Sequence, residues 1–114
     1  MTNDPQATAR RMYEAFNARD YTATQEIFTE DFYSHPLDAT GPSSVAQAWK
    51  RFHQAFPAVR VVVEDMIIER DRVATRTSVH GIPGRKPPTM MEIFAIRDGR
   101  IAELWGLSSL DRDN

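Results

Sequence analysis

The chain has 114 residues, a formal net charge of −2, 41% hydrophobic residues and 26% charged residues. These values are ordinary for a globular protein and suit one domain over residues 1–114. Acidic residues are interspersed among the basic ones, so the sequence does not predict the basic surface of a nucleic-acid-binding protein. No apolar run approaches the roughly 20 residues of a membrane span. Neither a nucleic acid nor a membrane is therefore an expected partner. The chain has no cysteine, which excludes disulfides, thiolate metal sites and cysteine nucleophiles and suits a cytoplasmic location.

Helix signals dominate the N-terminal half. Asp4 is placed to cap a first helix, and Pro5 suits its first position. Apolar residues then recur at helical spacing until the helix ends near residues 17–20. A short second helix is expected over residues 22–28. An extended segment follows over residues 31–36, because a proline disfavours helical geometry in the residue before it.

A third helix is expected after a Gly-Pro turn at residues 41–42. Ser44 and Gln47 have the spacing of a capping box, and Pro57 ends the helix. Its apolar face comprises Val45, Ala48, Trp49, Phe52 and Phe56. This face is expected to pack against the core.

The C-terminal half has the pattern of β-strands. The strand segments lie at residues 60–69, 72–82, 89–97 and 100–110. A proline-rich loop follows the second segment, and Asp98-Gly99 predicts a hairpin between the last two. Helices followed by long antiparallel strands predict an α+β fold, with a curved antiparallel sheet wrapped on the N-terminal helices. The concave side of such a sheet, closed by the helices, predicts a cavity for a small hydrophobic ligand.

Several segments, taken in their order and spacing, are typical of one family. The most specific is residues 96–105, in which an Asp-Gly hairpin precedes a Glu-x-Trp strand. The others are Tyr13 with Phe16 and Asn17, Tyr21, the segment Phe32-Tyr33-Ser34-His35-Pro36, Trp49-Lys50-Arg51-Phe52, Phe56-Pro57, Val73-Ala74-Thr75-Arg76 and His80-Gly81. Over nearly its whole length the chain resembles the SnoaL-like polyketide cyclase family. This family belongs to the nuclear-transport-factor-two-like superfamily, together with ketosteroid isomerase, scytalone dehydratase and limonene epoxide hydrolase.

The resemblance implies a cone-shaped α+β barrel of the cystatin-like, nuclear-transport-factor-two-like type, commonly a homodimer packed through the sheet. In the cyclases, an aspartate four residues after the tryptophan is the general acid and base of an aldol ring closure. Counting from Trp105, this position is Ser109. A serine cannot replace a carboxylate in moving a proton at neutral pH, so the sequence departs from the family at this residue.

Glu92 is the first candidate for a general base. It shares a strand face with Met90, Phe94 and Ile96, and a carboxylate on a mostly apolar face is expected to have a raised pKa. The alternative is a structural ion pair, with Arg76 as a possible partner.

His35 and His80 are further catalytic candidates, because an imidazole acts as acid or base near neutral pH. The alternative for His35 is a loop histidine bonded to a backbone carbonyl. Arg76 and His80 share one face of their strand. On the inner face, Arg76 would hold an enolate or carboxylate oxygen and His80 would move a proton. On the outer face, both would be solvated or lie at a dimer interface.

The candidate substrate-binding residues are Tyr13, Phe16, Trp49, Phe52, Arg76, Met90, Phe94, Trp105 and Ser109. Trp105 is expected to form a cavity wall, although aromatic and methionine residues at regular spacing are also typical of plain core. Glu103 and His53 suit structural roles. No metal site is expected, because His35, His53 and His80 are not spaced as ligands on one element. No cofactor is implied either, because the nucleotide-binding glycine motifs are missing.

Three functions remain open. The first is a cofactor-independent enzyme acting on a small hydrophobic oxygenated substrate, in the manner of a polyketide cyclase, an isomerase or a lyase. The second is a non-catalytic small-molecule-binding protein, which Ser109 favours. The third is an accessory protein that pairs with another enzyme.

Overall fold

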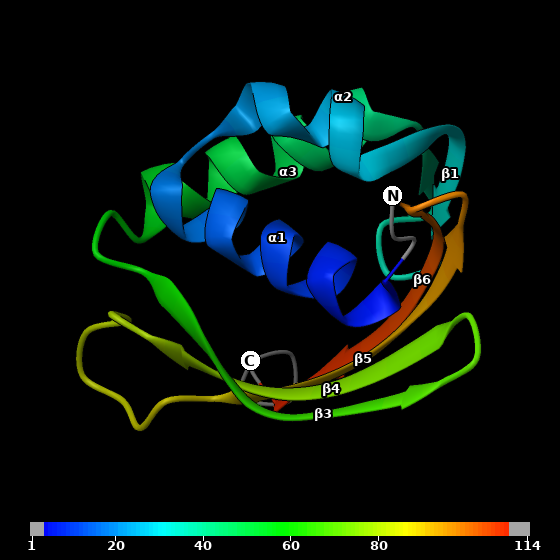
Figure 1. Ribbon diagram of the computed structural model, residues 1–114. Coiled ribbons are helices and arrows are strands. Elements are labelled where there is room, and N and C mark those ends of the chain that lie inside the picture. The colour runs from blue at the N-terminus through cyan, green and yellow to red at the C-terminus, as the bar shows by residue number, and fades with distance from the viewer. Residues whose placement is uncertain (1–3, 110–114) are drawn as a thin grey trace.

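The computed structural model describes residues 4–109. Its helices are α1 (Pro5–Ala18), the 3-10 turn η1 (Tyr21–Ala23), α2 (Thr24–Ile27) and α3 (Pro42–Ala55). Its strands are β1 (Phe28–Ser34), β2 (Ala39–Thr40), β3 (Arg60–Glu69), β4 (Arg72–His80), β5 (Thr89–Arg97) and β6 (Arg100–Ser108). The long strands curve beneath the helices, and α1 lies on the concave side of the sheet (Figure 1). The α+β fold expected from the sequence is therefore confirmed.

One six-stranded sheet has the order β2-β1-β6-β5-β4-β3. The four long strands β3 to β6 pair antiparallel, as the sequence predicts. β1 differs, because it pairs in parallel with β6 and makes the sheet mixed. The sheet wraps partly around the helices without closing, since β2 and β3 remain at its edges.

The helix boundaries follow the capping signals with one exception. The Asp4 side chain accepts a hydrogen bond from the Gln6 backbone, which confirms the predicted start of α1. The capping box at Ser44 is wrong, because α3 begins earlier, with Gly41 as its N-cap and Pro42 in the first turn. Gly41 has a φ of 89°, which glycine adopts without strain, and the φ of proline suits the first helical position. The Ser44 hydroxyl instead donates to the carbonyl of Thr40.

A β-bulge in β6 changes which side chains face inward. Ile101 lies opposite Ile96, whereas Glu103 lies opposite Ala95, so β6 has one additional residue between these two pairs. The additional residue shifts the alternation of side chains by one position. As a result, Leu104 faces the helices, whereas Glu103 lies on the outer side.

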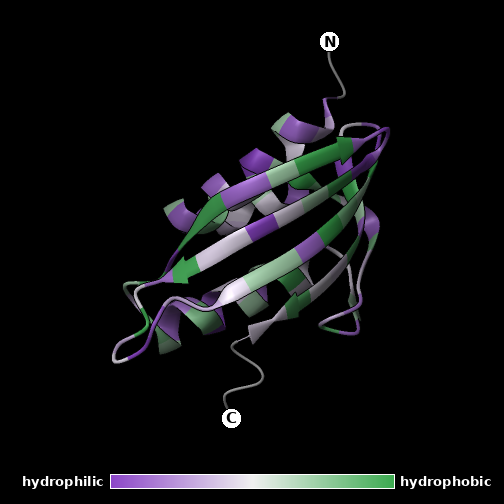
Figure 2. Cartoon of the chain, turned by 90° about the horizontal axis from the view of Figure 1, so that it is seen from below, coloured by the Kyte–Doolittle hydropathy of each residue, from purple (hydrophilic) through white to green (hydrophobic). Residues whose placement is uncertain are grey.

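The core lies between the concave face of the sheet and the helices. Its largest fully buried side chains are Phe28, Phe32, Phe94, Ile27 and Ile101. The convex face, by contrast, is not covered by any of the helices within residues 4–109 (Figure 2). Within residues 4–109, no helix is both long and apolar enough to cross a membrane.

Candidate functional site

A cavity of about 380 Å³ lies on the concave side of the sheet. Its lining includes Met12, Tyr13 and Phe16 from α1, Trp49 and Phe52 from α3, Phe28, Phe32 and Ser34 from β1, Met90 and Glu92 from β5, and Leu104 and Ser108 from β6. The volume lies in the range of small-molecule sites, and most of the lining is apolar. Among the described lining residues, Glu92 is the one charged side chain.

Glu92 reaches this cavity because β5 places alternate side chains on the inner face. Its Oε1 accepts a hydrogen bond of 2.7 Å from the Tyr13 hydroxyl. Within residues 4–109, no other hydrogen bond to this carboxyl group is formed. Burial raises the pKa of Glu92, and the hydrogen bond from Tyr13 opposes this effect with a smaller contribution. The carboxyl group therefore holds a proton more tightly than an exposed glutamate does, as a general base requires.

Tyr13 connects Glu92 to the neighbouring strand. It comes from α1, is buried, and packs edge-on against Phe94 with ring centroids 6.0 Å apart. Its hydroxyl lies 2.7 Å from Oγ1 of Thr75 on β4. Burial and the nearby charge of Glu92 both raise the pKa of Tyr13, so its hydroxyl remains a proton donor.

Gly106 leaves room for the side chain of Glu92. It lies opposite Glu92 in the pairing of β5 and β6. A Cβ atom at Gly106 would lie 3.2 Å from Cγ of Glu92 and 3.6 Å from Cγ of Pro36. A larger residue at this position would therefore press on Glu92.

Five of the predicted binding residues line this cavity, and they are Tyr13, Phe16, Trp49, Phe52 and Met90. Phe94 is fully buried and belongs to the core rather than to the cavity lining. Ser34, Leu104 and Ser108 also line the cavity but were not singled out as candidates from the sequence.

Arg76 and His80 lie on the outer face of β4, the second of the two positions expected for them, and not in the inner cavity where they were candidate site residues. Side chains alternate along β4, and its inward face consists of Val73, Thr75, Thr77 and Val79. Arg76 forms an ion pair of 2.6 Å with Asp65 of β3 instead of contacting Glu92. Nε2 of His80 lies 2.9 Å from the Ser78 hydroxyl.

His35 and Trp105 also lie outside the cavity. The His35 ring stacks on Trp105 with centroids 4.9 Å apart, and its Nε2 lies 2.6 Å from Oε2 of Glu103. Both side chains of this contact are partly exposed. Trp105 does not line the inner cavity as expected, because the bulge in β6 directs its side chain to the outer face of the sheet.

Ser109 is likewise not among the residues that line the cavity. Its Oγ accepts a hydrogen bond of 2.9 Å from the backbone N–H of Thr89, at the end of the sheet. The neighbouring Ser108 lines the cavity instead. Ala102 is the additional residue of the bulge. The sequence would have predicted the inward position of Ser108 only if Ala102 had been recognised as this residue.

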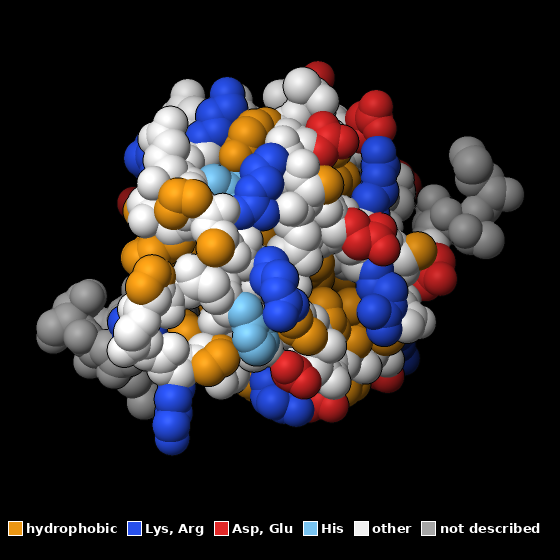
Figure 3. Space-filling model, turned by 90° about the vertical axis from the view of Figure 1, so that its left-hand side faces the viewer, with side chains coloured by type: hydrophobic (Ala, Val, Ile, Leu, Met, Phe, Trp, Pro, Cys, Tyr) orange, Lys and Arg blue, Asp and Glu red, His pale blue; other side chains and the backbone are white. Residues whose placement is uncertain are grey.

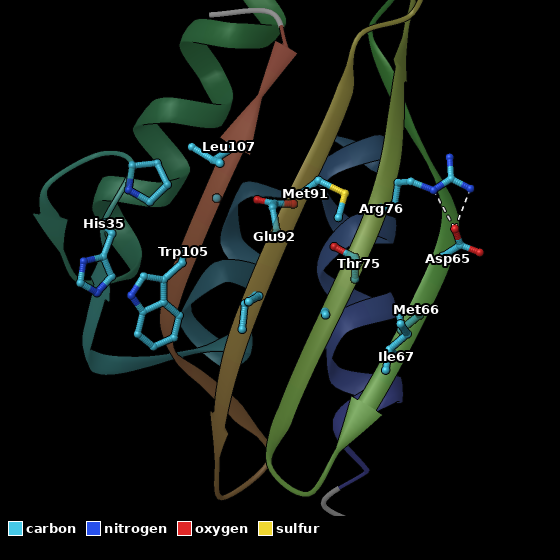
Figure 4. Close-up of a pocket in the computed structure, with 14 residues that line it drawn as sticks. His35, Asp65, Met66, Ile67, Thr75, Arg76, Met91, Glu92, Trp105 and Leu107 are labelled. Atoms are coloured by element: carbon cyan, nitrogen blue, oxygen red, sulfur yellow. Dashed lines mark hydrogen bonds and ion pairs between the residues drawn. The ribbon is translucent and has the colours of Figure 1, made fainter.

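A second hollow, of about 710 Å³, lies on the outer face of the sheet. Its lining includes Ile67, Met91, Ile93, Trp105 and Leu107, with the Asp65–Arg76 ion pair at one side (Figure 4). Ile67, Met91, Ile93 and Leu107 are large apolar side chains that remain exposed. The end of the molecule seen in Figure 3 carries side chains of both charge signs. Within residues 4–109, no group of three or more histidine and acidic side chains is arranged to hold a metal ion.

Comparison with protein families matches residues 9–104 to the SnoaL-like domain. Comparison with functionally curated proteins found no match. Among solved structures, wild-type IdmH from Streptomyces antibioticus is described as a proposed polyketide cyclase. It is 26% identical, with a TM-score of 0.82 over 95% of this chain and 94% of IdmH.

Two further structures support the same fold. A proposed polyketide cyclase from Bacillus cereus is 25% identical, with a TM-score of 0.81 over 90% of this chain and 72% of that protein. A SnoaL-like polyketide cyclase from Agrobacterium tumefaciens is 12% identical and has a TM-score of 0.84 over 99% of this chain and 98% of that protein, which supports the fold alone. The match over residues 9–104 shows that the chain belongs to the SnoaL-like family.

Proposed function

We propose that the chain is a cofactor-independent enzyme that moves a proton next to a carbonyl group of a small, largely apolar, oxygenated substrate. The reaction would be an aldol cyclisation, an isomerisation or a dehydration. The observation that supports this proposal most is Glu92, a carboxylate in an apolar cavity whose Oε2 has no hydrogen-bond partner within residues 4–109. The similarity to IdmH, a proposed polyketide cyclase, points to the same class of reaction.

In the proposed step, Glu92 removes a proton from the carbon next to the carbonyl group. The electron pair of the C–H bond forms the carbon–carbon double bond of an enolate, and the negative charge moves to the carbonyl oxygen. In an isomerisation, the protonated Glu92 returns the proton to another carbon. The raised pKa of Glu92 makes its carboxylate a stronger base than an exposed one.

Ser34 is the proposed hydrogen-bond donor to the substrate oxygen. Its hydroxyl lines the same cavity, is buried, and accepts a hydrogen bond from the Leu37 backbone. Within residues 4–109, its own proton has no acceptor. A carbonyl oxygen placed there would gain a donor as negative charge develops on it.

Glu92→Gln tests the proposal with 2-tetralone, a small bicyclic ketone with acidic protons next to its carbonyl group. Proton NMR in D₂O measures the exchange of these protons for deuterium. We expect wild-type protein to accelerate the exchange and Glu92→Gln to lower the acceleration about 100-fold or more, because the amide cannot accept the proton. The matched control is Glu103→Gln, which changes the outward glutamate paired with His35 and should leave the exchange unchanged.

Equal acceleration by wild type and Glu92→Gln would contradict the proposed role of Glu92. The alternative function is a non-catalytic binding or accessory protein, which is favoured by Ser109 and by its position outside the cavity. If wild-type protein binds 2-tetralone, as read from a change in tryptophan fluorescence, but does not accelerate exchange, the binding function replaces the enzymatic one.

We further propose a homodimer packed through the outer face of the sheet. This face exposes Ile67, Met91, Ile93 and Leu107. The partly exposed charges beside them have both signs, as in the Asp65–Arg76 pair, so a second copy would not meet an excess of like charge. An apolar centre flanked by both signs suits a symmetric, self-complementary contact.

A further inference from the structure

We infer that Thr75 is a positioning residue that fixes the direction of a chain of hydroxyl protons, Thr75 to Tyr13 to Glu92. In this order Tyr13 always donates to Oε1 of Glu92, and Oε2 is the oxygen that takes up and releases the reacting proton. The inference rests on the proposed function and adds to it the atom at which the proton moves.

Three elements bring these groups together. Thr75 and Glu92 are directly opposite each other in the pairing of β4 and β5, and both face the helices. Tyr13 of α1 lies above them. Its hydroxyl is 2.7 Å from Oγ1 of Thr75 and 2.7 Å from Oε1 of Glu92. The Tyr13 oxygen is therefore the middle member of a chain of two short hydrogen bonds.

Counting the protons gives the direction. A hydroxyl group has one proton to donate, and the Tyr13 proton lies on the bond to Glu92. The proton between Thr75 and Tyr13 must then come from Thr75. In the reverse order, Glu92 would donate to Tyr13 and Tyr13 to Thr75, so the Thr75 proton would need another acceptor.

No such acceptor is present within residues 4–109, where the hydroxyl of Thr75 forms a hydrogen bond only with that of Tyr13. Thr75 is 2% exposed, so water does not replace the missing partner at the surface. A buried donor without an acceptor destabilises the reverse order. Oε1 therefore stays an acceptor whether or not Glu92 is protonated, and the proton is added to Oε2.

Few groups lie close enough to Glu92 to change the direction of these hydrogen bonds. Tyr13 from α1, Thr75 from β4 and Gly106 from β6 lie next to Glu92. Within the described part of the chain, Tyr13 is the one titratable group that influences the ionisation of Glu92.

The same strand provides a matched control. Thr77 lies two residues from Thr75, faces the same side and is 1% exposed. Its Oγ1 has no hydrogen-bond partner within residues 4–109. Thr75→Val and Thr77→Val thus make the same chemical change at two buried sites, only one of which contacts Tyr13.

The test is a titration of the Glu92 side-chain carboxyl by carbon-13 NMR, which requires no substrate. Without Thr75 as donor, Tyr13 becomes a weaker donor to Glu92. We therefore expect Thr75→Val to raise the titration midpoint by about half a pH unit or more. Thr75→Ser, which keeps the hydroxyl, and Thr77→Val should both titrate as the wild type does. A Thr75→Val midpoint equal to that of the wild type would overturn the inference.

A second comparison shows whether Thr75 acts through Tyr13. The double variant Tyr13→Phe/Thr75→Val should titrate as Tyr13→Phe does, because the intermediate hydroxyl is already missing. A further shift in the double variant would overturn the inference. The two proposals fail separately: a wild-type protein that does not accelerate the exchange contradicts the enzymatic function, whereas unchanged titrations contradict the role of Thr75.

Discussion

At the scale of single residues, the ionisation of Glu92 lowers the stability of the fold. Its pKa is raised in the folded protein, so the folded state binds this proton more tightly than the unfolded chain does. The resulting stabilisation is complete below the ordinary pKa of 4.5 and is lost as the pH rises through the raised value. A residue whose ionisation lowers the stability of the folded protein is a candidate for a role in function rather than in stability.

Thr77 gives a prediction about stability alone. Its buried hydroxyl has no hydrogen-bond partner within residues 4–109. Thr77→Val removes the unsatisfied group and keeps the side-chain shape, so we expect the free energy of unfolding to increase by about 1 kcal/mol. Urea denaturation should show a higher midpoint with an unchanged slope. A lower midpoint would show that the Thr77 hydroxyl is satisfied, for instance by ordered water.

The sequence predicts the positions of these side chains better than their contacts. The inward position of Glu92 follows from alternation with Phe94 and Ile96 along a regular strand. Its contact with Tyr13 does not, because the two residues are 79 positions apart and meet only when α1 packs on the sheet. Thr75 could be assigned to the inner face from its alternation with Val73 and Val79, but its partner could not be predicted.

At the scale of elements, strands were predicted well where their alternation is regular. The bounds of β3 and β5 agree with the expected segments, and the Asp98-Gly99 hairpin lies between β5 and β6 as predicted. The bulge in β6 was not predictable from hydrophobic periodicity, because Ala102 suits either side of a strand. This one additional residue explains why Trp105 lies outside the cavity.

Helix starts show how neighbouring signals compete. Ser44 has the chemistry of a capping residue, but Gly41 and Pro42 start α3 earlier in the chain. The expected second helix over residues 22–28 is divided into η1 and α2, and Phe28 already belongs to β1. Local propensity thus predicted each helix and the first turn of α1, but neither the first turn of α3 nor the division of the second helix.

At the scale of the whole molecule, the two faces of the sheet have different environments. The inner face carries the cavity with Glu92, and the outer face carries the stacked His35 and Trp105 rings beside exposed apolar side chains. Glu92 is also among the residues that line the outer hollow, so the proposed chemistry and the proposed assembly meet at β5. The sequence indicated both surfaces, but it left the face of Arg76 and His80 open and placed Trp105 at the inner cavity rather than at the outer hollow.

The proposed homodimer predicts the effect of one charge on the outer face. Leu107 is 75% exposed, so Leu107→Glu should affect the folded monomer little but bury a charge in the dimer contact. We expect analytical ultracentrifugation to give a dimer for the wild type and a monomer for Leu107→Glu.

The matched control is Leu37→Glu, which changes an exposed leucine at the opening of the inner cavity and should remain dimeric. A monomeric wild type, or a dimer that Leu107→Glu does not weaken, would contradict assembly through this face.

The most direct test of the proposed chemistry is the pH dependence of 2-tetralone exchange, measured beside the NMR titration of Glu92 in the same protein. Because only the ionised carboxylate accepts a proton, we predict that the catalysed rate rises with pH. Its midpoint should lie above 4.5 and coincide with that of Glu92. A rate that does not follow the titration of Glu92, or a Glu92 pKa at or below 4.5, would contradict the account.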